Sequence, residues 1–274
     1  MMMATQTLDW ANDPVKKLRQ GYKAQRAAIA RYSAPDVAIE ETKFSSGTGL
    51  KFTPKILGLG ADILYFHGGG WIAGSPWTHR TLCSWMAKFT AQRVFAAPYN
   101  LAPEHKFPAQ ANQAAEITNH FLINRKRIFL AGDSAGGAMV LWAADGVKQK
   151  SSIQGIVSLY GAFGCMDGPS HASHSENSLG FNVSALRAMY HYLGCDDVSE
   201  FRARFSESGA PLLLVKAEFD PIAGDNDWMA QQTKHPVTHL LAAGQAHAYL
   251  QACGNNSEAD ASMLEIANWI KALV

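Results

Sequence analysis

One serine of the chain lies in a Gly-x-Ser-x-Gly pattern, which reads GDSAG at residues 132–136. An apolar run at residues 127–131 predicts a strand before it, and residues 135–148 predict a helix after it. A serine on so sharp a turn projects its Oγ away from the backbone, and the flanking glycines prevent a collision with the neighbouring strand or helix. Ser134 is therefore a candidate nucleophile, and the N–H of Ala135 at the helix N-terminus is a candidate donor to an oxyanion.

Three consecutive glycines follow a predicted strand at residues 62–66, within the stretch HGGGW that begins at His67. Such a run loses much backbone entropy on folding, so it indicates a close approach of the backbone or unusual dihedral angles. An oxyanion hole would explain both, with the N–H groups of Gly69 and Gly70 joining that of Ala135. A phosphate-cradling loop is the alternative, but neither GxxxxGK(S/T) nor GxGxxG follows. We expect His67 to hold the loop rather than to act as a base.

A nucleophilic serine needs a base within hydrogen-bond reach, and that base needs an acceptor that fixes its tautomer. Turns after strands suit both roles better than the interior of a helix or strand. His247 follows a predicted strand at residues 237–242, and Asp220 follows one at residues 211–217. We expect His247 to be the base and Asp220 the acid of a catalytic triad with Ser134.

Three other acidic residues compete with Asp220 for the role of the acid. Glu218 lies too close to the end of its strand. Asp225 and Asp227 are typical of the first turn of a helix, where a carboxylate interacts favourably with the helix dipole.

No metal ion and no cofactor are expected. His171 and His174 form an HxxH pair, but a loop lacks the helical geometry that aligns two ligands, and Glu176 alone does not complete a site. The four cysteines are scattered without CxxC spacing, which favours reduced thiols over a zinc site or a disulfide framework.

The composition excludes several classes of partner. Apolar residues make up 47% and charged residues 17% of 274, which favours a globular protein with a sizeable core over a disordered chain. The 24 basic and 23 acidic residues nearly cancel and form no dense basic cluster, so we expect no nucleic-acid partner. Neither a leader nor an apolar run of about 18 residues is visible, so we expect a cytoplasmic protein without a membrane partner.

Short β-rich runs alternate with helical stretches after about residue 60, which predicts an α/β fold with a mostly parallel sheet and helices on both faces. The predicted strands are residues 62–66, 94–99, 127–131, 153–160, 211–217 and 237–242. The predicted helices are residues 78–89, 109–122, 135–148, 225–233 and about 258–273, the last with Ser257 as its N-cap. Upstream, residues 37–44 and 50–57 predict a leading antiparallel pair.

Two segments fall outside this alternation. Residues 1–36 predict an N-terminal helical cap segment, and residues 37–274 form the expected catalytic domain, which carries an insertion at about 161–209 with a short helix near 184–193. We interpret both segments as a lid over the site, and covering a sheet edge is the alternative. Aromatic residues that could line a pocket there are Trp10, Tyr22, Phe163, Phe181, Tyr190 and Tyr192.

The motifs resemble those of the hormone-sensitive-lipase-type family of α/β-hydrolases, which includes bacterial carboxylesterases with an HGGG loop. HGGGW, the stretch YNLAPEHKFPA from Tyr99 to Ala109 and GDSAGG at residues 132–137 occur in the family's order, and the resemblance covers roughly residues 60–250. It implies an eight-stranded α/β-hydrolase fold, with the acid after the seventh strand and the histidine after the eighth. The family usually has His-Gly-Phe where this chain continues from His247 to Ala248 and Tyr249.

The expected function is hydrolysis of small-molecule esters with short acyl chains, because the insertion is short and lacks the long apolar cover that suits a lipid interface. An amidase, formamidase or lactonase on the same triad is an alternative, and a ligand receptor that has lost catalysis is another. Retention of all three triad residues argues against the receptor. We expect Glu104, in a buried turn, to pin the loop under the site. Pairing into a homodimer through an edge strand or the last helix stays open.

Overall fold

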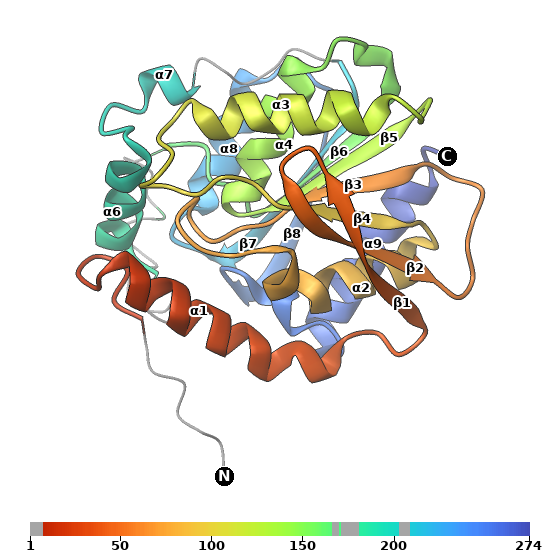
Figure 1. Ribbon diagram of the computed structural model, residues 1–274, viewed down its shortest axis with the longest axis horizontal. Helices are drawn as coiled ribbons and strands as arrows, with labels where there is room; N and C mark the ends of the chain where they lie inside the picture. The colour runs from red at the N-terminus through yellow and green to blue at the C-terminus, as the bar shows by residue number, and fades with distance from the viewer. Residues whose placement is uncertain (1–7, 166–169, 171–180, 203–208) are drawn as a thin grey trace.

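The computed structural model describes residues 8–165, 170, 181–202 and 209–274. Its centre is an eight-stranded sheet with the order β1-β2-β4-β3-β5-β6-β7-β8 (Figure 1). β1 pairs with β2 and β2 with β4 in antiparallel fashion, and every later pair is parallel. The strands are β1 Val37–Phe44, β2 Gly47–Pro54, β3 Asp62–Phe66, β4 Val94–Ala97, β5 Ile128–Asp133, β6 Ile153–Leu159, β7 Leu212–Phe219 and β8 Val237–Ala246.

Helices cover both faces of this sheet (Figure 1). The helices are α1 Val15–Ile29, α2 Arg80–Thr90, α3 Ala109–Leu122, α4 Ala135–Gly146, α6 Val183–Leu193, α7 Ser199–Arg202, α8 Ala223–Gln232 and α9 Ser257–Lys271. α3, α4 and α8 share one apolar core, whereas α2 and α9 share the other. Successive residues of a buried strand supply the two cores in turn: Leu64 of β3 faces the first and Tyr65 the second. A sheet buried on both faces explains why its strands read as continuous apolar runs.

The expected fold class is confirmed, and several element boundaries differ from the expectation. β7 continues to Phe219 and β8 to Ala246, so Glu218 lies inside a strand, while Asp220 and His247 come directly after their strands. The prediction of Ser257 as the N-cap of α9 was wrong by one residue. The side chain of Asn256 accepts the hydrogen bond from the N–H of Ala259, which leaves Ser257 as the first helical residue.

The N-terminal segment follows one side of the molecule, where α1 runs across the bottom of the view in Figure 1. Leu18 and Tyr22 are buried on its inner face. Arg19 donates hydrogen bonds to the carbonyl oxygens of Ile72 (2.7 Å) and Ala102 (2.9 Å), which attach α1 to loops at the edge of the sheet. Within the described ranges, no helix is long and apolar enough to cross a membrane.

Candidate active site

Ser134 sits on the sharp turn between β5 and α4. Its φ of 53° and ψ of −116° are strained for a residue with a side chain. The turn is held by a hydrogen bond from the Ser134 N–H to the carbonyl oxygen of Leu159 (2.8 Å). A Cβ on Gly136 would lie 2.0 Å from the carbonyl oxygen of Phe66, so the helix can approach β3 only with glycine at this position. This steric limit accounts for the glycine after the serine in the motif.

The structure brings Ser134, His247 and Asp220 together from the ends of three strands. Nε2 of His247 lies 3.0 Å from Oγ of Ser134, and Nδ1 of His247 lies 2.7 Å from Oδ2 of Asp220. Asp220 is fully buried, and its other carboxylate oxygen accepts a hydrogen bond from the N–H of Ile222 (3.0 Å). The ring of Phe181 stacks on the imidazole at a centroid distance of 4.4 Å. The imidazole is therefore fixed in orientation between a hydroxyl and a carboxylate.

The glycine loop lies beside this serine. Gly69 has a φ of 116°, and a Cβ there would approach the carbonyl oxygen of Ala73 to 2.3 Å, so only glycine fits. The Gly69 carbonyl accepts hydrogen bonds from the N–H groups of Ile72 and Ala73, which closes the loop into a turn. Gly69 and Gly70 line the same cavity as Ser134, and Ala135 begins α4 next to it. The three residues expected to supply oxyanion donors thus lie at or next to the cavity that contains Ser134.

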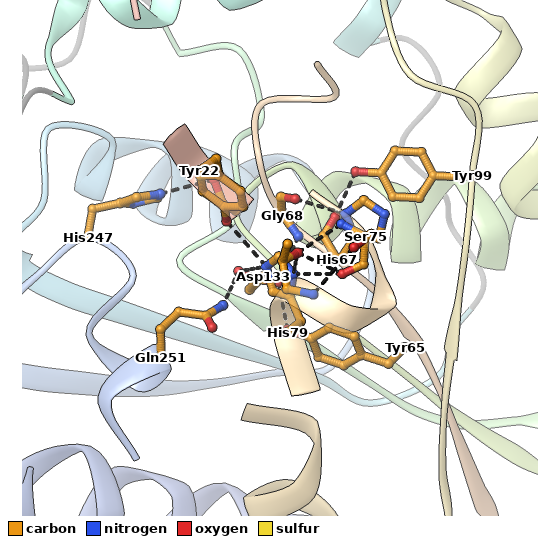
Figure 2. A network of polar contacts seen from close by, with 12 residues as sticks. Tyr22, Tyr65, His67, Gly68, Ser75, His79, Tyr99, Asp133, His247 and Gln251 are labelled. Carbon is orange, nitrogen blue, oxygen red and sulfur yellow. Dashed lines mark hydrogen bonds and ion pairs between the residues drawn. The ribbon is translucent and has the colours of Figure 1, made fainter. Parts of the chain in front are cut away.

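A buried carboxylate connects the glycine loop to the serine turn. Asp133 is 2% exposed and occupies the centre of the polar network in Figure 2. Its Oδ1 accepts hydrogen bonds from the Tyr65 hydroxyl (2.6 Å) and the Gly68 N–H (2.8 Å). Its Oδ2 lies 3.3 Å from Nε2 of His79 and 3.2 Å from the amide nitrogen of Gln251. Burial alone would raise the pKa of this carboxyl, but His79 and the hydrogen bonds lower it well below its usual range.

His67 packs under the loop. It is 1% exposed, its Nδ1 lies 2.9 Å from the carbonyl oxygen of Gly68, and its ring stacks on Tyr99 at 4.2 Å. Burial and the neighbouring His79 lower the pKa of His67 to about 3, so the ring is neutral at physiological pH. The Tyr99 hydroxyl donates to the His67 carbonyl oxygen (2.8 Å), which ties the stretch beginning at Tyr99 to the loop. These contacts fit a supporting role for His67.

A cavity of about 670 Å³ opens above Ser134. This volume is typical of a small-molecule site. Its walls come from α1, the glycine loop, α6 and the segment around His247, and they include Tyr22, Arg26, Met189 and Tyr249. Three of the six aromatic residues singled out from the sequence, Trp10, Tyr22 and Phe181, line it. Phe163 and Tyr190 are buried in the core and Tyr192 packs against that core, and none of the three is among the residues that line the cavity.

A family model described as alpha/beta hydrolase fold matches residues 63–251. The chain belongs to this α/β-hydrolase family. An acetyl esterase of Salmonella paratyphi B is 25% identical over 96% of this chain and 88% of its own length. A hormone-sensitive lipase from a metagenome library is 25% identical, with a TM-score of 0.83 over 96% of this chain and 94% of its own. An esterase from the bacterial hormone-sensitive lipase family shares the fold at 21% identity, with a TM-score of 0.85 over 96% and 94% of the two chains. The resemblance inferred from the motifs is confirmed.

In this α/β-hydrolase the three competing acids contact partners other than His247. Glu218 accepts a hydrogen bond from the N–H of Gly244 (2.7 Å), and Asp227 pairs with Lys216 (2.6 Å). Asp225 lies in the first turn of α8, as expected, where it is fully buried and accepts a hydrogen bond from the N–H of Phe163. The same expectation was wrong for Asp227, which lies beyond the first turn. Burial raises the pKa of Asp225 to about 8.

The expectation that Glu104 lies in a buried turn was also wrong. Its side chain is 55% exposed and forms a bidentate ion pair with Arg19 of α1, at 2.6 and 2.7 Å. Arg19 lowers the pKa of Glu104 to about 2. Glu104 therefore joins the α/β-hydrolase core to the N-terminal helix at the surface, a partnership across 85 positions that no local sequence pattern indicates.

Sequence reasoning missed Arg26 and Met189 as cavity-lining residues of this α/β-hydrolase. Arg26 had a detectable signal, because it lies four positions after Tyr22 and therefore on the same face of a helix. The part of the chain that the structure describes contains no group of three or more His, Cys, Asp and Glu residues that could hold a metal ion. His171, His174 and Glu176 lie outside the described residues.

Proposed function

We propose that this protein is a carboxylesterase that hydrolyses short-chain acyl esters of small molecules, with Ser134, His247 and Asp220 as its catalytic triad. The observation that carries the proposal is the placement of the His247 imidazole, 3.0 Å from the Ser134 hydroxyl and 2.7 Å from the Asp220 carboxylate, at a cavity. The names of the acetyl esterase and esterase relatives support the ester bond as the target.

The reaction follows from this geometry as two acyl transfers. His247 takes the proton of Ser134 as Oγ attacks the ester carbonyl, and Asp220 stabilises the imidazolium that forms. The N–H groups of Gly69, Gly70 and Ala135 would hold the oxyanion, each contributing about 10²- to 10³-fold in rate. The tetrahedral intermediate collapses, His247 gives its proton to the departing alcohol, and the acyl group stays on Ser134. Water, deprotonated by His247, then releases the acid by the same steps.

The cavity supports a short acyl chain. Side chains from α1 and α6 bound it above the serine, with Tyr22 and Met189 among them. An acyl group of a few carbons fits within this cavity, and α1, which Arg19 attaches to the core, forms one of its walls.

Hydrolysis of p-nitrophenyl esters from acetate to palmitate tests the proposal. We expect kcat/KM to be highest for chains of two to about four carbons and to fall steeply beyond them. A preference for long chains would contradict the chain-length claim. The same assay is repeated with anilides of the same acyl groups and with lactones. If these are hydrolysed faster than the esters, the protein is an amidase or a lactonase instead.

Association into a homodimer through an edge strand or the last helix, α9, stays a prediction, as does residence in the cytoplasm. β8 is the last strand of the sheet in the described structure, and Leu241 on it is 60% exposed. Sedimentation of the purified protein decides between one and two copies, and a monomer at micromolar concentration would contradict the pairing.

A further inference from the structure

Arg26 stands out among the residues that line the cavity because it brings a positive charge to the inner face of α1. Leu18 and Tyr22 are buried on this face, and the positions that follow at helical spacing are Arg26 and Ile29. The other cation in this half of the helix, Lys23, is exposed to solvent. An apolar residue would be the ordinary choice where Arg26 lies.

The guanidinium has no anionic partner within the described chain. Its Nε is buried and donates no hydrogen bond, and no carboxylate in the described residues forms an ion pair with the guanidinium. The ring of Tyr22 lies 4.8 Å from the guanidinium carbon, and the two side chains share a hydrogen bond. Burial raises the pKa of Tyr22, so this hydroxyl is neutral at physiological pH.

Asp133 is the one carboxylate among the described cavity-lining residues, and it is already engaged. Tyr65 and Gly68 bond to one of its oxygens, and His79 and Gln251 contact the other. A desolvated cation without an anionic partner is unfavourable, and a guanidinium presents a planar set of donors that matches a carboxylate. The cavity that Ser134 lines therefore also has, in Arg26, a donor set for an anion.

We propose that Arg26 binds a carboxylate group of the substrate, so that the preferred esters are anionic: half-esters of dicarboxylic acids or acyl esters of hydroxy acids. This inference rests on the proposed esterase function and names the substrate class of the same site. The carboxylate would pair with the guanidinium while the ester carbonyl lies at Ser134. Arg26 thus acts as a specificity-determining residue.

Two matched pairs of esters test the proposal, each with and without the charge. Monoethyl succinate is compared with ethyl butyrate for a charge on the acyl side, and 4-acetoxybenzoate with 4-acetoxybenzamide for a charge on the alcohol side. In the wild-type enzyme we expect a higher kcat/KM for the charged ester of at least one pair. Arg26→Gln should reduce that charged-to-neutral ratio roughly 10- to 100-fold, mostly through KM, as expected for one charge-assisted hydrogen bond.

Lys23→Met is the control, because it removes a positive charge from the exposed face of the same helix. Lys23→Met should leave the ratio of kcat/KM for charged and neutral esters unchanged. A charged-to-neutral ratio that stays unchanged in Arg26→Gln would overturn the proposal. If kcat/KM falls equally for charged and neutral esters, Arg26 only supports the fold.

Binding separates this inference from the proposed function. The Kd of monoethyl succinate is measured by calorimetry on two catalytically inactive proteins, Ser134→Ala and the double variant Ser134→Ala/Arg26→Gln. We expect the Kd to be at least about tenfold higher for the double variant. If the wild type hydrolyses no ester but this difference holds, the esterase function fails and the anion site stands. If esters are hydrolysed and the Kd is unchanged, the anion site fails alone.

Discussion

The N–H of Gly68 donates a 2.8 Å hydrogen bond to Oδ1 of Asp133, the residue next to Ser134 in sequence. This bond joins the start of the glycine loop to the serine turn, so the candidate oxyanion donors and the candidate nucleophile share one fixed support (Figure 2). The Gln251 amide reaches the same carboxylate from the segment after His247. One buried carboxylate thereby positions three parts of the site.

Asp133→Asn is expected to weaken both the fold and catalysis. The amide of Asn replaces one acceptor oxygen by a donor, so at least one buried partner of Asp133 loses its hydrogen bond, which should reduce the free energy of unfolding by about 1–3 kcal/mol. A displaced glycine loop should lower kcat by about tenfold or more, with a smaller effect on KM. Urea unfolding and steady-state kinetics measure the two effects. Asp145→Asn, at the exposed end of α4, is the control, and a full kcat in Asp133→Asn would disprove the positioning role.

Arg19→Met should destabilise the protein more than Glu104→Gln does. Arg19 donates to two backbone carbonyls in addition to the carboxylate, and each lost hydrogen bond should reduce the free energy of unfolding by about 1 kcal/mol. Glu104 is exposed, so losing its charge should change stability by less than about 1 kcal/mol. KM should rise only in Arg19→Met, since α1 forms a wall of the cavity. Equal effects of the two substitutions would contradict this division of roles.

The sequence predicted the parts of the site that local sterics or the end of a strand determine. Ser134 was identifiable because the glycine after it meets the backbone of β3, and Asp220 and His247 because parallel strands deliver their carboxyl ends to one edge. The role of Asp133 was not predictable, since its partners Tyr65 and Gln251 lie 68 and 118 positions away. Such contacts depend on packing between segments, and periodicity within one segment carries no information about them.

Asp225 should make stability depend on pH. Its pKa is raised from 3.8 to about 8 by burial, so the unfolded chain loses this proton at a lower pH than the folded protein does. Asp225 therefore lowers the free energy of unfolding as pH rises from about 4 to about 8, by up to about 1.4 kcal/mol per pH unit. Asp225→Asn removes this decline.

The comparison needs urea unfolding of wild type and Asp225→Asn at pH 5, 6, 7 and 8. The stability of the variant relative to wild type should increase across this range and level off above pH 8. Asp227→Asn, an exposed neighbour on α8, provides the reference. A difference that stays constant with pH would mean that the Asp225 carboxyl is ionised throughout.

Asp220→Asn and Glu218→Gln distinguish the acid of the triad from its nearest competitor. Asp220→Asn should lower kcat by about 10⁴-fold, because the imidazole would hold the wrong tautomer. Glu218→Gln loses the charge on one exposed hydrogen bond to Gly244, which should lower activity by no more than about fivefold. A larger loss in Glu218→Gln than in Asp220→Asn would reverse the assignment.

Covalent labelling tests most directly whether Ser134 is the nucleophile. A fluorophosphonate should modify the folded wild-type protein once, with the added mass on the peptide that contains Ser134, and it should abolish ester hydrolysis in proportion. Ser134→Ala protein with an unchanged circular dichroism spectrum should take up no label and lose about 10⁴-fold or more in kcat. Labelling of another residue, or near-normal turnover by Ser134→Ala, would contradict the proposed mechanism.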